Sequence, residues 1–136
     1  MNTRRITAVV SSVVCIWLAL SSACFAAETA EPGRPILDKL LKAIEANDHD
    51  SFVADGDPVF KAALTKEMLE AVSAQFSPRM KKGYQYSYLG ELSQQGCRVL
   101  LWKLVFKDGG DDTLAKLVLK DGKVAHIWLQ WQVAVR

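Results

Sequence analysis

The sequence predicts an α+β domain in which N-terminal helices pack on one face of a curved, antiparallel four-stranded meander. Two observations carry this prediction. Apolar residues recur at helical spacing as far as Phe76, and after Gly83 the period changes to two, as in a strand whose side chains alternate between faces. A run of helices followed by a run of strands is typical of the α+β class.

The first 26 residues have the organisation of a secretory signal peptide. Arg4 and Arg5 give a positively charged start, an apolar run from Ile6 to Leu20 follows, and small residues precede the expected cleavage after Ala26. The apolar run is shorter than the roughly 20 residues needed to span a bilayer. We therefore expect a secreted or periplasmic protein without a membrane span.

Two of the three cysteines, Cys15 and Cys24, lie in this expected signal. A lipoprotein cut before Cys24 is the alternative, although Ser21 stands where such a signal usually has leucine. Cys97 would remain alone after export, so no internal disulfide could form. We interpret Cys97 as a small buried strand residue, with an intermolecular disulfide or a reactive thiol as alternatives.

Composition favours one small, formally neutral domain. Loss of two arginines with the signal reduces the 17 Lys and Arg to 15, which equals the 15 Asp and Glu. A nucleic-acid-binding protein normally keeps a basic excess, so that class loses support. The remaining chain suffices for a single core. We expect residues 1–26 to be the signal, 27–34 a disordered lead-in and 35–136 one domain.

Helical segments are predicted to precede the sheet. Pro35 suits the first position of a helix, and Asp50 can cap a short second one. Residues 59–64 are too few to classify. Thr65 should cap a third helix that Pro78 limits, because the residue before a proline avoids helical backbone. The first helix would bury Ile36, Leu37, Leu40, Leu41 and Ile44 and expose Asp38, Lys39, Lys42 and Glu45; the third would bury Met68, Leu69, Val72 and Phe76.

Four strands are predicted, at about residues 84–88, 97–107, 113–120 and 124–133. Ser93–Gly96 and Asp108–Asp111 have turn composition and separate the first three strands. Asp121-Gly122 separates the last two and is a strong hairpin signal, since both central residues of a type I′ turn need positive φ.

Two stretches carry a resemblance to a known family. Leu40 to Asp48 reads Leu-Leu-x-Ala-Ile-x-x-x-Asp, and the meander contains Asp-Gly-Lys-Val from Asp121. The chain from Ile36 to Trp131 resembles the nuclear transport factor 2-like superfamily, the cystatin-like cone that includes ketosteroid-isomerase-like enzymes. It is most similar to small exported members of unknown function. The resemblance implies a sheet wrapped round a long helix, a pocket at the wide end and often a homodimer, but no activity.

The turns sort the strand side chains into two faces. A two-residue turn at Asp121-Gly122 pairs Leu117 with His126, and a four-residue turn at 108–111 pairs Trp102 with Leu117. A slip of one residue in either turn would exchange a strand's faces. We expect the helices to cover the face without central lysines, which holds Leu100, Trp102, Leu104, Phe106, Ala115, Leu117, Leu119, Val124, His126, Trp128 and Gln130.

This inner face supplies a candidate small-molecule pocket of aromatic and polar residues. Its members are Trp102, His126, Trp128 and Gln130, together with Tyr84, Tyr86 and Tyr88. His126 is the one group there that titrates near neutral pH, and the strand acids fall in turns. Ketosteroid-isomerase-like enzymes need an Asp base and an acidic donor, so only His126 could be the base here. A histidine packed at the core edge is the alternative.

The leading functional hypothesis is therefore a non-enzymatic binding or assembly module with a small-molecule or peptide ligand. The alternative is a small isomerase, dehydratase or cyclase-like enzyme centred on His126 and the tyrosines. We expect no cofactor and no metal, because two histidines and one cysteine lack ligand spacing and the acids between Asp48 and Asp57 fail the calcium-loop pattern.

The opposite face of the sheet also carries many apolar residues. Because a soluble monomer seldom exposes so large an apolar surface, we expect a homodimer through this face. Lys103, Lys116 and Lys120 interrupt that face and would form a rim. Coverage by helices, after a register slip, is the alternative. The expected interface residues are Val99, Leu101, Val105, Val118, Ile127, Leu129 and Trp131.

Overall fold

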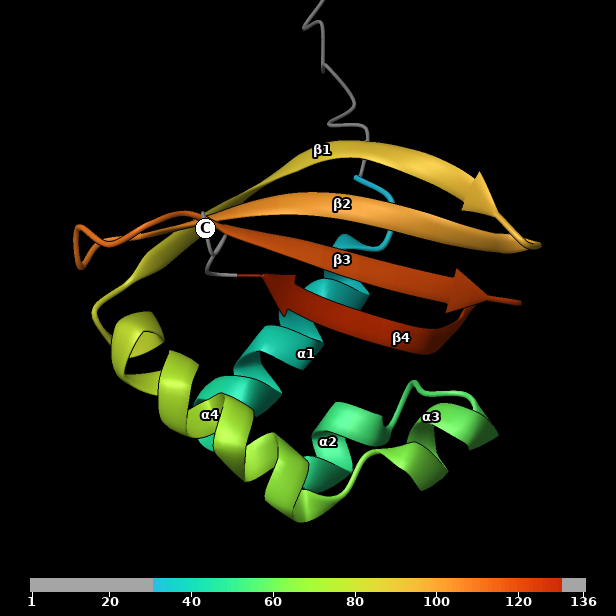
Figure 1. Ribbon diagram of the computed structural model, residues 1–136, viewed down its shortest axis with the longest axis horizontal. Coiled ribbons are helices and arrows are strands. Elements are labelled where there is room, and N and C mark those ends of the chain that lie inside the picture. The colour runs from blue at the N-terminus through green and yellow to red at the C-terminus, as the bar shows by residue number, and fades with distance from the viewer. Residues whose placement is uncertain (1–30, 131–136) are drawn as a thin grey trace, which may run out of the picture.

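The structure is a computed structural model that describes residues 31–130, so the expected signal peptide and Trp131 lie outside the described residues. Figure 1 shows the sheet as one curved layer with the helices on one side of it. The strands form an antiparallel meander in the order β1-β2-β3-β4, which confirms the predicted α+β class. The elements are α1 (Arg34–Ala46), α2 (His49–Val53), α3 (Pro58–Ala63), α4 (Lys66–Lys81), β1 (Tyr84–Gln94), β2 (Cys97–Phe106), β3 (Thr113–Lys120) and β4 (Lys123–Gln130).

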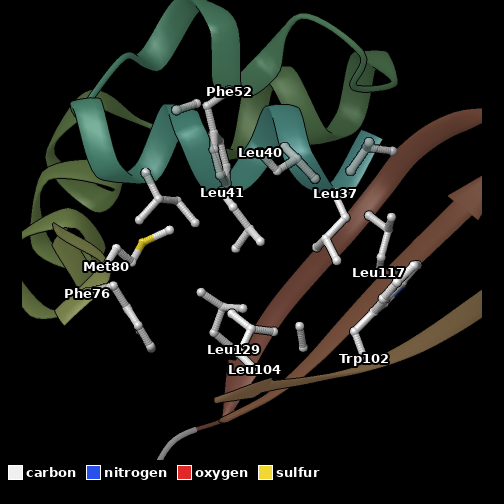
Figure 2. Packing of buried hydrophobic residues seen from close by; sticks show 14 of the residues in the cluster. Leu37, Leu40, Leu41, Phe52, Phe76, Met80, Trp102, Leu104, Leu117 and Leu129 are labelled. Carbon is white, nitrogen blue, oxygen red and sulfur yellow. The ribbon is translucent and has the colours of Figure 1, made fainter. Parts of the chain in front are cut away.

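The long helix α1 packs its apolar stripe on the sheet, as the sequence predicts (Figure 2). Its start differs from expectation, because Gly33 and Arg34 belong to the folded unit rather than to a disordered lead-in. Gly33 caps the helix at φ 72°, and a Cβ there would lie 2.4 Å from Leu100 Cδ1. Only glycine combines this backbone angle with so close an approach to the sheet.

The two short helices are each capped by an aspartate. Asp48, not the expected Asp50, caps α2, since its carboxylate accepts the backbone N–H of Ser51. Asp57 caps α3 by accepting the N–H of Phe60. Both aspartates therefore stand at helix ends, where a carboxylate satisfies an N–H of the first turn.

Helix α4 begins as predicted, with Thr65 accepting the N–H of Met68, but it continues through Pro78 to Lys81. The last turn is stabilised by tertiary contacts, because Met80 is buried and Arg79 binds the β2–β3 loop. These contacts offset the hydrogen bond that a proline removes from a helix. Met68, which the sequence placed in the core, is 53% exposed.

The contact between α4 and α1 includes two serines of α4 and not Met68. Ser73 donates to the carbonyl of Ile44 at 2.6 Å, and Ser77 donates to the carbonyl of Glu45 at 2.8 Å. Both acceptors belong to the last turn of α1, where helix carbonyls lack partners within the helix. The two serines therefore join α4 to the C-terminal end of α1.

The first three strands keep the expected faces with different pairings. The β2–β3 loop is longer than a four-residue turn, so Trp102 pairs with Ala115 instead of Leu117. A shift of two residues leaves each side chain on its predicted face. The β1–β2 turn is also tighter than expected, because β1 runs to Gln94 and only Gln95 and Gly96 form the turn, both with positive φ.

The last strand contains a β-bulge that the sequence analysis missed. Lys120 pairs with Lys123 as predicted, but Val118 pairs with His126, so Ala125 is an extra residue in β4. One extra residue exchanges the two faces for the rest of the strand. Ile127 and Leu129 therefore point toward the helices, and His126 and its alternate neighbours point away.

The bulge coincides with a tertiary attachment at Val124. The Val124 N–H donates to the carbonyl of Asp55, and its carbonyl accepts the N–H of Asp57, both at 2.8 Å. These bonds hold the α2–α3 loop against β4 and satisfy backbone groups that an edge strand otherwise leaves unpaired.

Candidate functional site

The inner face of the sheet is filled by packed side chains. Trp102 is fully buried, with its ring at edge-on contact with Tyr86 (centroids 5.7 Å apart) and Tyr88 (5.1 Å). Figure 2 shows the side chains of Leu37 and Leu41 of α1 pointing toward the sheet, where Leu117 and Leu104 lie. Aromatic pairs in this geometry add stability beyond the burial of their area. The space expected to hold a ligand is occupied by core residues in the part of the chain described.

The three tyrosines of β1 lie half-buried along one edge of this core, and Tyr86 meets a polar pair from α1. Its hydroxyl donates to the carboxylate of Asp38, and the Arg34 guanidinium lies 4.8 Å from the centre of its ring. Burial and the bond to Asp38 raise the pKa of Tyr86 to about 12. The phenol is therefore neutral at physiological pH and acts as a hydrogen-bond donor.

Asp38 is the residue in this cluster that the sequence analysis missed. It was assigned to the solvent face of the first helix, yet it is half-buried and points at Tyr86. Its spacing from Arg34, four residues earlier, places both on one flank of the helix. That spacing was available in the sequence, but which flank meets β1 depends on how the helix sits on the sheet.

The predicted pocket does not assemble, because its members lie on opposite faces of the sheet. Trp102 and the tyrosines are on the inner side, whereas the bulge places His126, Trp128 and Gln130 on the outer side. The predicted inward placement of those three residues is therefore wrong. No acid or tyrosine faces His126 across its strand pair, which is Val118.

The outer sheet face, defined by these outward-pointing residues, is the candidate functional site. Trp128 is its most prominent side chain, at 51% exposed, and it pairs with Lys116, whose Nζ lies 5.0 Å from the centre of the indole ring. Such a cation–π contact holds the ring in place while leaving its far side open. The face consists of Leu92, Val99, Leu101, Lys103, Val105, Leu114, Lys116, Val118, His126, Trp128 and Gln130.

A hollow lies on this same face beside the β1–β2 turn. It is an open cleft of about 510 Å³ bordered by Val99, Val118, Lys116 and Cys97. Val99 is buried at its base, whereas Val118 is half-buried. Cys97 is half-buried rather than buried as predicted, and its Sγ lies 3.9 Å from the carbonyl of Gln95. An exposed aromatic ring and a hollow of mixed apolar and polar lining, which Gln94 and Gln95 also border, thus occur on one surface.

The acids and histidine of the 48–57 region have structural contacts instead of metal-binding geometry. His49 Nε2 lies 2.9 Å from the carbonyl of Leu64, so it joins the two ends of the α2–α3 segment. Among residues 31–130 no group of three His, Cys, Asp or Glu side chains could hold a metal ion. None of the helices in that range has the length and apolar character that a membrane crossing requires.

No protein-family model and no curated protein matches the sequence. Among solved structures, the chain is similar to an uncharacterised cystatin-fold protein from Novosphingobium aromaticivorans, determined at 1.90 Å resolution. The two sequences are 15% identical, and the match covers 70% of this chain and 94% of the other with a TM-score of 0.39. A likeness this distant carries no argument about activity, so the fold description rests on the helices and strands themselves.

Proposed function

We propose that this protein is an exported, non-catalytic assembly module that self-associates through the outer sheet face. The observation that carries the proposal is the exposed Trp128 on the same sheet face as a hollow with Val99 and Val118 in its lining, a face that the helices leave uncovered. The filled inner face supports a module over an enzyme, because Trp102 is packed core there and the residues expected to complete a substrate pocket with it, His126, Trp128 and Gln130, lie on the other face.

A second copy of the chain is the occupant that this geometry favours. In a two-fold dimer the same patch serves both partners, so a protruding group and a recess on one face complement each other. Trp128 supplies the protruding group and the Val99–Val118 hollow the recess. Tryptophan is also among the residues that contribute most to interface energy.

The size and charge of the face indicate a weak dimer. Four strands about 4.8 Å apart and about eight residues of 3.3 Å long give a face of roughly 500 Å² per copy. Two such faces bury an area near the lower limit for stable complexes. Lys103 and Lys116 also give both copies positive charge on this face, and like charges repel. We therefore expect dissociation in the micromolar range.

Sedimentation analysis of the chain expressed in full and purified in its processed form tests the proposal. We expect the weight-average mass to rise with concentration from monomer toward dimer. Trp128→Glu should keep the protein monomeric throughout, because it places an unpaired charge at the centre of the interface.

Val59→Glu is the matched control, since Val59 is 73% exposed and belongs to α3, which lies on the helix side of the sheet (Figure 1). It introduces the same charge in place of another exposed apolar residue, so it should dimerise like the unmodified protein. Circular dichroism checks that both variants fold. A monomer at all concentrations, or equal loss of dimer in both variants, contradicts the proposal.

A further inference from the structure

A second surface, which shares no residue with the outer sheet face, has several positive charges around a cleft. The cleft has a volume of about 470 Å³ and lies between the start of α1, the α2–α3 loop and the β3–β4 turn. Three lysines border it, Lys39 from α1, Lys61 from α3 and Lys123 from β4, with Asp55 as the one acid of its lining. We call it the three-lysine cleft.

The charges of the three-lysine cleft do not cancel. Lys39 Nζ lies 2.7 Å from Asp55 Oδ2, so these two groups neutralise each other. Lys61 and Lys123 have no ion pair among residues 31–130. Asp57, which follows the lining in sequence, turns its carboxylate to the N–H of Phe60. Two positive charges therefore remain on the border of the cleft.

The walls of the cleft are fixed to each other by the backbone. The two 2.8 Å hydrogen bonds of Val124 join the residue after Lys123 to Asp55 and Asp57, on the opposite wall. Val124 itself is fully buried, which anchors the β3–β4 turn against the helices. The backbone positions from which the lysine side chains extend are thereby held in place. A preorganised site loses less entropy when a ligand binds.

The lining also includes uncharged surface. Pro35, Ile36, Ala54 and Gly56 form part of the cleft, and Ile36 is half-buried. Ligand sites of a few hundred Å³ combine apolar walls with a few charged groups that fix orientation. The cleft is therefore suited to an organic anion more than to an inorganic ion alone.

We propose that the three-lysine cleft binds a small organic dianion, either a phosphate monoester or a dicarboxylate. Its charged groups contact Lys61 and Lys123, since lysine binds such groups as a compact point charge with three donors. Its hydrocarbon part lies against Ile36. This inference goes beyond the proposed self-association, because the outer sheet face contributes no residue to the cleft.

Titration of the isotope-labelled protein, followed by amide chemical shifts, tests the proposal. The probes are phenyl phosphate, glutarate and inorganic phosphate, with phenol as the uncharged counterpart of the first. We expect saturable shifts at Ile36, Gly56, Lys61 and Gly122 with phenyl phosphate or glutarate, and weaker binding of inorganic phosphate. Whichever organic probe binds more tightly identifies the anionic group. Added salt should weaken binding, because the two lysines are exposed to solvent screening.

Two double variants that remove the same number of positive charges distinguish binding in the three-lysine cleft from general attraction of anions to the protein surface. Lys61→Met/Lys123→Met should reduce affinity about tenfold or more, whereas Lys42→Met/Lys107→Met, which removes two exposed lysines outside the cleft, should change it less than about twofold. Equal losses in both pairs, shifts spread over the whole surface, or no saturable shift with either organic anion would overturn the proposal. Trp128→Glu should still bind the probe, so failure of this site and failure of the dimer are distinguishable.

Discussion

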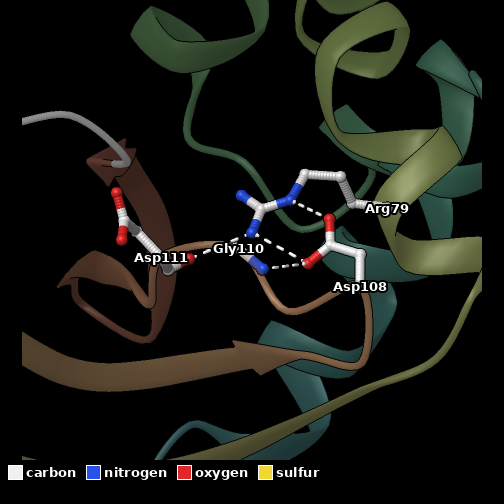
Figure 3. A network of polar contacts seen from close by, with 4 residues as sticks. All are labelled: Arg79, Asp108, Gly110 and Asp111. Atoms are coloured by element: carbon white, nitrogen blue, oxygen red, sulfur yellow. Dashed lines mark hydrogen bonds and ion pairs between the residues drawn. The ribbon is translucent and has the colours of Figure 1, made fainter.

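Arg79 in the last turn of α4 binds Asp108 in the β2–β3 loop, with Nε 2.6 Å from Oδ2 (Figure 3). Both residues make further polar contacts within the same loop. The Asp108 carboxylate also accepts the N–H of Gly110 at 2.9 Å, and Arg79 donates to the carbonyl of Asp111. The guanidinium lies 4.1 Å from the centre of the Phe106 ring. One arginine thus fixes the loop that connects two strands to the end of the helix beyond Pro78.

The first prediction concerns acid stability. The hydrogen bonds from Arg79 and Gly110 lower the pKa of Asp108 to about 2. A carboxyl group with a lowered folded-state pKa stabilises the fold above its ordinary pKa near 4, and this stabilisation is lost as the pH falls toward 2. Asp108→Asn should therefore show a smaller loss of stability between pH 5 and about pH 2 than the unmodified protein.

Denaturant unfolding at constant ionic strength across that range measures the effect. Asp112→Asn, at an exposed position of the same loop, is the control and should follow the unmodified protein. If both variants respond to acid alike, the Arg79–Asp108 contact is not the source of the pH dependence.

The second prediction concerns the tyrosine edge at high pH. Because the folded-state pKa of Tyr86 is raised to about 12, its contribution to stability is complete below pH 10 and is lost between about 10 and 12. Ultraviolet difference spectra should show a late phase from Tyr86 in addition to delayed ionisation of Tyr84, whose pKa burial also raises. Tyr86→Phe should remove this late phase, and Asp38→Asn should move it to lower pH by removing the charged acceptor. Persistence of the late phase in Tyr86→Phe would assign it to another tyrosine.

The third prediction concerns the serine contacts between α4 and α1. Ser73→Ala removes the side-chain donor of the Ile44 carbonyl, which keeps only the N–H of Asn47, and the loss of this hydrogen bond should cost about 0.5–1.5 kcal/mol. For a domain of this size each kcal/mol lowers the thermal midpoint by roughly 4–8 °C. Ser93→Ala, at an exposed position in β1, should change the midpoint little. Equal midpoints for the two variants in a thermal melt would contradict the structural role of Ser73.

The fourth prediction concerns export. Protein recovered from its own host should begin at Ala27, because the small residues Cys24 and Ala26 precede the expected cleavage site. N-terminal sequencing with intact mass measurement tests this. A lipid-modified N-terminus at Cys24 would identify a lipoprotein, and a chain that retains Met1 would contradict the signal assignment.

Local patterns in the sequence determined most of the fold. The change of period at Gly83 separated helices from strands, Thr65 marked the start of α4, and Asp121-Gly122 placed the last hairpin correctly, with Lys120 opposite Lys123. These features depend on residues within a few positions of each other, where propensity, capping and turn geometry act directly. The buried face of α1 could also be predicted, because apolar residues recur at helical spacing along it.

Only the tertiary structure decided which residues form a surface. The bulge at Ala125 arises where Val124 bonds to a loop almost seventy positions earlier in the chain, and it moves His126 and Trp128 to the outer face. A bulge shifts the phase of residue alternation by one position, but the shift is hard to detect in β4, where apolar residues stand on both sides of the strand. The burial of Asp38 and the continuation of α4 through Pro78 likewise depend on partners on other elements, Tyr86 and Asp108. The sequence therefore determined the helices and strands and their order. Contacts between distant segments determined the candidate site, because these contacts can outweigh the local backbone preferences from which helices and strands are predicted.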